Sequence, residues 1–106
     1  MKGVIEMTNQ DRIEKLKKLM VNVVIIKWGL EKERNLNKKP DKAEKIKQDV
    51  IELAREVDKE IGKKGQVENE VVEGFSKYTI QKKMGINNQI KCIVDRIEEA
   101  IDIFSK

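Results

Sequence analysis

Two pairs of carboxylates have the residue types and the spacing of a metal-binding site. Asp49 and Glu52 are three positions apart, and Glu70 and Glu73 repeat the same spacing. Residues at i and i+3 of a helix lie on neighbouring parts of one surface. Two carboxylates held in this way can share a hard cation, because such ions prefer oxygen ligands. These four residues are therefore the candidate metal ligands of the chain.

The angular positions of the pairs indicate how they could meet. At roughly 100° per residue, Asp49 lies about −100° from Val50, the centre of its apolar stripe, and Glu70 lies at the same offset from Val71. The second acid of each pair lies at about −160°. In two antiparallel helices packed stripe to stripe, equal offsets fall on one side, which predicts four carboxylates along one groove. The two pairs differ by about 8 Å in their distance along the helix axis from the turn that joins the helices. The second acid of each pair would need a further helix, which a second subunit could supply, to close the site.

Nearby residues extend this candidate site, and each also has a simpler interpretation. Lys45 and Lys77 lie on the flanks of the two acidic helices, where they could meet phosphates or only neutralise the acids. As i, i+4 partners of Asp49 and Glu73 they would form ordinary surface pairs, worth roughly a few tenths of a kcal/mol each. Trp28, the only Trp, could stack on a nucleobase, although packing at the end of a helix is the simpler interpretation.

The composition removes several classes of function. The 106 residues include no His and one Cys, Cys92, which excludes His-based triads, clustered zinc sites and an internal disulfide. Lys and Arg number 23 against 19 Asp and Glu, and because the signs are interleaved, the net charge of +4 does not predict a nucleic-acid partner. The longest apolar run, 23–26, is far shorter than the roughly 18 residues of a membrane span, and the N-terminus lacks the apolar stretch of a signal peptide. We expect a cytoplasmic protein without a membrane partner.

The apolar periodicity predicts that the chain begins with a long helix. After an expected flexible tail over residues 1–7, Thr8 or Asn9 can cap a helix whose apolar residues recur at three- and four-residue steps. The β-branched segment 20–28 could instead be a buried strand. We favour a helix because the helical period continues on both sides, with a kink or an end expected at Gly29.

Further helices are expected after a linker at residues 34–40, and Phe75 and Tyr78 are expected in their core. The second helix is predicted to start at Asp41, with Glu44 completing a capping box, and to stop at Gly62 and Gly65. The third is predicted to run from about Gln66 to about Met84, with Gly85 as its stop. The fourth is predicted to be capped by Asn87 or Asn88. Short loops make neighbouring helices antiparallel. We therefore expect residues 8–106 to form one all-α domain, an antiparallel bundle of three or four helices that completes its core by oligomerising.

Three segments together resemble the motifs of one enzyme family. They are residues 48–56 (QDVIELARE), 70–75 (EVVEGF) and 83–87 (KMGIN). In this order they are similar to the motifs E-E-x-x-E-L-A, E-x-x-D and L-G-I-D of the MazG-like nucleoside triphosphate pyrophosphohydrolases. Gln48 stands where the family has an acid, and Asp49 stands where it has Glu. The resemblance covers residues 41–95.

The resemblance implies an all-α, usually oligomeric enzyme that hydrolyses an NTP or dNTP to the monophosphate and pyrophosphate. Mg²⁺ is the implied cofactor, with Mn²⁺ as the alternative. Two such ions would screen the charge of the triphosphate and activate a water for attack at the α-phosphorus. The implied ligands are Asp49, Glu52, Glu70 and Glu73, and Glu56, one turn beyond Glu52, would support them or act as the base.

The residues also leave room for other functions. The altered first motif is compatible with a degenerate enzyme that kept only the fold. The main alternative is a non-enzymatic helical module that binds a protein through an exposed apolar stripe. A third interpretation is weak binding of nucleic acid through scattered lysines, which would fall steeply with salt.

Overall fold

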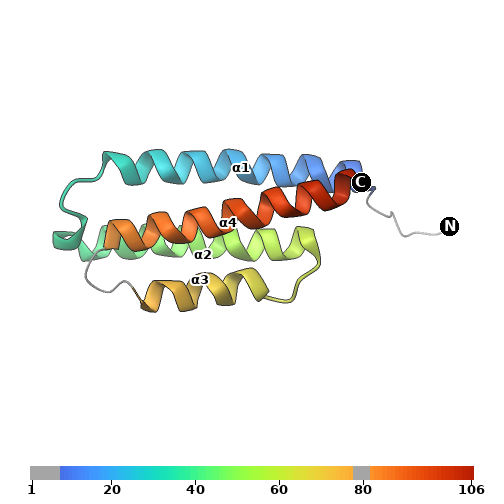
Figure 1. The fold of residues 1–106 in the computed structure, drawn as a ribbon. Coiled ribbons are helices and arrows are strands. Elements are labelled where there is room, and N and C mark those ends of the chain that lie inside the picture. Colours follow the sequence, from blue (N-terminus) through green and yellow to red (C-terminus); the bar gives the residue numbers. More distant parts are fainter. Residues whose placement is uncertain (1–7, 78–81) are drawn as a thin grey trace.

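The chain folds into a bundle of four α-helices in a computed structural model that describes residues 8–77 and 82–106. The elements are α1 (Asn9–Lys32), the short 3-10 helix η1 (Leu36–Lys38), α2 (Pro40–Ile61), α3 (Gln66–Ser76) and α4 (Lys82–Ser105). Successive α-helices run antiparallel, and α1 and α3 lie on opposite sides of the α2–α4 pair (Figure 1). No strand occurs in these residues, so the predicted all-α fold is confirmed. The tail predicted at 1–7 and the side chain of Tyr78 lie outside the described residues.

α1 begins where the sequence predicts and continues further than expected. The Thr8 side chain accepts a hydrogen bond from the Asp11 N–H at 3.1 Å, and Asp11 accepts one from the Thr8 N–H, which completes a capping box. The β-branched segment 20–28 is helical throughout. Gly29 does not end the helix, which continues to Lys32, because Leu30 is fully buried beyond it and tertiary packing outweighs the low helix propensity of Gly.

The predicted cap of α2 is wrong. Pro40, not Asp41, opens the helix, and Lys39 is its N-cap without any side-chain hydrogen bond. Proline suits the first helical position because its fixed φ is helical and its missing N–H would have had no partner. Glu44 therefore does not close a capping box but accepts a hydrogen bond from the Gln48 side chain at 2.7 Å. The helix ends as predicted, at Gly62 with a φ of 73°.

The predicted boundary between the last two helices is also wrong. α3 ends at Ser76, and Met84, Gly85 and the two predicted caps, Asn87 and Asn88, all lie inside α4. The buried face of α4 reaches back to Ile86, which is 3% exposed. Burying this residue keeps the chain helical through Gly85, so the glycine does not act as a stop.

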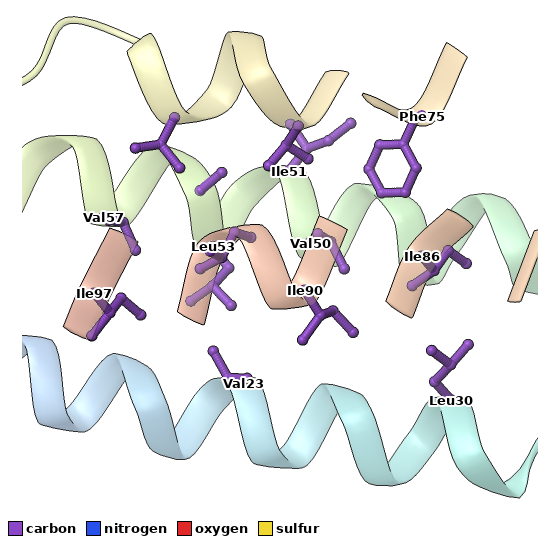
Figure 2. Packing of buried hydrophobic residues seen from close by; sticks show 14 of the residues in the cluster. Val23, Leu30, Val50, Ile51, Leu53, Val57, Phe75, Ile86, Ile90 and Ile97 are labelled. Carbon is purple, nitrogen blue, oxygen red and sulfur yellow. The ribbon is translucent and has the colours of Figure 1, made fainter. Parts of the chain in front are cut away.

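All four α-helices contribute to one apolar core. Val23 and Leu30 of α1 point towards Ile86, Ile90 and Ile97 of α4, while residues of α2 and Phe75 of α3 close the core from the other side (Figure 2). The largest fully buried side chains are Leu16, Leu30, Ile93, Ile97, Val50, Val57, Val67 and Val71. None of the helices in the described parts of the chain combines the length and the apolar composition that a membrane-spanning segment needs.

Candidate functional site

The first acidic pair borders an open groove between α1 and α2. The groove has a volume of about 260 Å³ and is lined by Asn22, Ile25 and Ile26 of α1 and by Asp49, Glu52, Leu53 and Glu56 of α2. The three acids follow one another at i, i+3 and i+7, so they form a row along one edge of α2. We call Asp49, Glu52 and Glu56 the acidic row. Glu56, the predicted base, thus accompanies the first pair.

The second acidic pair lies in a different groove. Glu70 and Glu73 line a space between α3 and α4, together with Lys77 and Gln89. The predicted single groove edge with four carboxylates is therefore not formed within one chain. Among the described residues, no three acidic or Cys side chains are grouped closely enough to hold a metal ion. The carboxylates that the structure describes are therefore not grouped into an all-protein site for Mg²⁺ or Mn²⁺ within one chain.

The pairs diverge because the apolar stripes of α2 and α3 do not simply face each other. Both helices also pack against α4, so both stripes point towards a core that α4 shares. Equal angular offsets then turn Asp49 towards α1 and Glu70 towards α4. The rule that equal offsets meet holds only for an isolated pair of helices, and this bundle has four.

Glu70 is held by a cation of the neighbouring helix. Arg96 of α4 donates to both of its carboxylate oxygens, with distances from 3.1 to 3.2 Å. The hydrogen bonds to Glu70 raise the pKa of the Arg96 guanidinium above its ordinary value. The Cys92 thiol also donates to Glu70 at 3.6 Å. Glu70 therefore ties α3 to α4, and it would have to leave Arg96 to bind a metal.

Cys92 lies in a setting that opposes thiolate chemistry. Burial raises the pKa of its thiol above the ordinary value, and the negative charge of Glu70 raises it further. Because the thiolate is the reactive form, Cys92 stays protonated and unreactive near neutral pH.

The acidic row, by contrast, is open to solvent. Asp49 pairs with Lys45 at 3.7 Å, as the i, i+4 spacing predicts, and Glu56 pairs with Lys59 at 3.6 Å. Within the described parts of the chain Glu52 makes no salt bridge, and its side chain is exposed. Exposed pairs of this kind are weak, so all three carboxylates remain available to a ligand or partner.

The outer face of α1 carries an apolar surface that the sequence analysis did not single out. Its four members are exposed to between 41% and 62%: Val21 is 58% exposed, Val24 41%, Ile25 58% and Trp28 62%. We call these four residues the α1 face. The interpretation of Trp28 as a packing residue is therefore wrong. The available signal was the apolar segment 20–28, which is too continuous to occupy only one side of a helix.

A second missed residue is Asp58, a carboxylate that is 3% exposed. It accepts hydrogen bonds from the Val67 N–H at 2.8 Å and from the Glu68 N–H at 3.0 Å. Asp58 thus caps the N-terminus of α3 from within α2, a role that Gly65, the N-cap residue, cannot fill. The sequence feature that could have indicated a buried Asp58 is its position directly after Val57, a residue of the apolar stripe of α2.

Comparison of the whole chain with known protein families, with curated proteins and with solved structures found no match.

Proposed function

We propose that this protein is a helical interaction module that binds a helix of a partner protein through the α1 face. The observation that carries the proposal is the exposure of four large apolar side chains on two successive turns of one helix. Single exposed apolar residues are ordinary on protein surfaces, but contiguous apolar patches mark binding sites.

The chemistry of the α1 face suits helix recognition. Val21, Ile25 and Trp28 follow one another at i, i+4 and i+7, which is the spacing that a groove-binding helix meets side by side. Covering a large aliphatic side chain is worth about 1.5–3 kcal/mol, and Trp is among the residues enriched at the energetic centres of interfaces. The face is also rigid, because Val23 and Leu30 of the same helix are buried in the core.

Trp28 offers a direct readout, because it is the only Trp in the chain and is exposed. Three synthetic helices of about five turns, free of Trp, share one Leu stripe and carry Lys, Gln or Glu along one flank. We expect at least one of them to shift the Trp28 emission to shorter wavelength in a saturable way. Ile25→Asp should weaken this binding by about tenfold or more, since it would bury an unpaired carboxylate.

The matched control is Ile103→Asp. Ile103 of α4 is 57% exposed, almost the same as Ile25, but it lies outside the α1 face, so this variant should bind like the wild type. If none of the three helices binds, and the protein stays monomeric in sedimentation, the α1 face is not a docking surface and the proposed function is wrong.

A second candidate is Mg²⁺-dependent hydrolysis of an NTP or dNTP, as the MazG-like motifs imply. The acidic row favours it, because Mg²⁺ usually binds through one or two carboxylates together with substrate phosphates. Asp49 and Glu52 would hold the ion, Glu56 would support them or act as base, and Lys45 and Trp28 would contact the nucleotide. Glu70, Glu73 and Lys77 would have to come from a second copy in a homo-oligomer.

Pyrophosphate release from a panel of NTPs and dNTPs, with Mg²⁺ or Mn²⁺, tests this candidate. Metal-dependent release that disappears in the Asp49→Asn, Glu70→Gln variant would establish the enzyme and name its substrate. No release across the panel would exclude hydrolysis and leave the interaction module.

A further inference from the structure

We propose that the partner of the α1 face is a basic amphipathic helix, with an apolar stripe and a flank of Lys or Arg that meets the acidic row. The inference rests on the proposed function and adds to it the chemistry of the partner. An unidentified occupant of an apolar face can be another protein, a second copy or a membrane, and the charges around the face distinguish among them.

The α1 face and the acidic row run side by side and have the same length. From Val21 to Trp28, and from Asp49 to Glu56, is seven residues in each case, or about 10 Å at 1.5 Å per residue. Because α1 and α2 are antiparallel neighbours (Figure 1), the acidic row lines one side of a groove whose other side includes Ile25 of the α1 face. The edge of the α1 face at Ile25 is therefore negative.

The cations nearby do not cancel this edge. Lys45 and Lys59 pair with Asp49 and Glu56, but both lysines are exposed, with side-chain exposures of 77% and 68%. Such pairs contribute little and exchange readily with an incoming cation. Arg55, a basic neighbour of Glu52, donates two hydrogen bonds of 2.9 and 3.1 Å to Glu68 and therefore does not neutralise Glu52.

The lysines of α1 stand at the two ends of the α1 face and on its flank away from α2, where Lys27 lies roughly 200° around the helix from Ile25. Lys17 and Lys18 lie one turn before Val21, and Lys32 lies one turn after Trp28, all of them exposed. They repel a basic partner at the ends and leave the acidic row as the favourable edge. The arrangement fits a helix of two to three turns with cations at about i, i+4 and i+7 on the flank that faces α2.

A second copy of this chain fits the same charges poorly. If two α1 faces pack antiparallel around a two-fold axis, the two acidic rows come to the same side and face each other. If they pack parallel, Lys17 and Lys18 of one copy meet the same residues of the other, as does Lys32. Like charges at close range suppress such pairings.

An anionic membrane fits poorly as well. The α1 face with its end lysines has the composition of a helix that lies on a lipid surface. The acidic row, however, would lie close to the negatively charged headgroups on the Ile25 side of that surface, where like charges repel.

The three synthetic helices test the inference by their ranking. At low salt we expect the Lys-flanked helix to bind about tenfold more tightly than the Glu-flanked helix, with the Gln-flanked helix between them. The difference should shrink as salt screens the exposed charges. The triple variant Asp49→Lys, Glu52→Lys, Glu56→Lys should reverse the ranking while the shared Leu stripe still binds.

A charge-matched control separates the acidic row from net charge. Asp95→Lys, Glu98→Lys, Asp102→Lys changes three exposed acids of α4 and alters the total charge equally. It should leave the ranking as in the wild type. Circular dichroism of both triple variants verifies that they remain helical.

Several results would overturn the inference. If the three helices bind with equal affinity, the partner does not need a basic flank, but the proposed function still holds. If none of them binds, both the inference and the proposed function are wrong. Concentration-dependent self-association that Ile25→Asp abolishes would assign the α1 face to a second copy. A Trp28 shift with vesicles of equal phosphatidylglycerol and phosphatidylcholine, retained in the acidic-row variant, would assign it to a membrane.

Discussion

The turn between α2 and α3 and the outer face of α1 reverse the usual distribution of polar and apolar groups. At the turn, the Asp58 carboxylate is 3% exposed, while on α1 the Trp28 side chain is 62% exposed. The buried charge is satisfied within the chain, by two backbone N–H groups of α3. The exposed aromatic ring lies with three other apolar side chains on a face that the bundle does not cover. The buried carboxylate is thus satisfied by the fold itself, whereas the exposed apolar face is left uncovered by it.

The largest effect is expected from Asp58→Ala. The substitution leaves two N–H groups without their acceptor at a buried helix start, and each costs about 1–3 kcal/mol. We expect a loss of about 3 kcal/mol in the free energy of unfolding, measured by urea denaturation. Asp58→Asn should lose less, because its amide oxygen still accepts one bond. A loss below about 1 kcal/mol for Asp58→Ala would mean that the carboxylate does not organise the turn.

Val23 and Ile25 provide the sharpest contrast within one helix. Val23 is 3% exposed and Ile25 58%. Val23→Ala should cost about 2 kcal/mol because it opens a cavity in the core, whereas Ile25→Ala should change stability by at most about 0.5 kcal/mol. Equal losses in thermal and urea unfolding would show that the α1 face is covered in the isolated protein.

Gly74 tests whether the α3–α4 contact is as tightly packed as the core. A Cβ at this position would run into the Gln89 side chain, which is 6% exposed. Gly74→Ala should therefore destabilise the protein by about 1 kcal/mol despite the better helix propensity of Ala. Adding Gln89→Ala should recover this loss in a double-mutant cycle, and an additive result would contradict the predicted clash.

The smallest effect is expected at the Arg55–Glu68 pair beside the turn. The hydrogen bond from Arg55 lowers the pKa of Glu68 below its ordinary value of 4.5. A carboxyl with a lowered folded pKa stabilises the protein above pH 4.5, and this contribution is lost as the pH falls through the folded pKa. Arg55→Gln should flatten the acid limb of the stability profile slightly, and an unchanged limb would mean that the pair contributes nothing.

Local patterns allowed much of the fold to be predicted from the sequence. The Thr8 cap, the α2 stripe and the end of α2 at Gly62 depend on neighbours within one or two turns. The errors arose where distant contacts decide. Gly85 is typical of a helix stop, but the helix continues through it because Ile86 is buried. Asp41 is typical of an N-cap, but Pro40 takes the first helical position, so Asp41 lies inside the helix.

The candidate site was less predictable because it depends on how helices surround one another. The offsets of Asp49 and Glu70 were derived from single helices, but the groove that each faces is set by the third and fourth helices of the bundle. Exposure of Trp28 could not be predicted either, since an apolar segment around a whole helix does not reveal which side the bundle leaves open.

The most direct test of the account is a titration of the protein with the Lys-flanked helix, followed through Trp28 emission. We expect a saturable blue shift whose midpoint Ile103→Asp preserves. Ile25→Asp should weaken the binding by about tenfold or more, and the triple Lys variant of the acidic row by about tenfold. A blue shift that both Ile25→Asp and the acidic-row variant leave unchanged would contradict the account, because binding would then depend on neither the α1 face nor the acidic row.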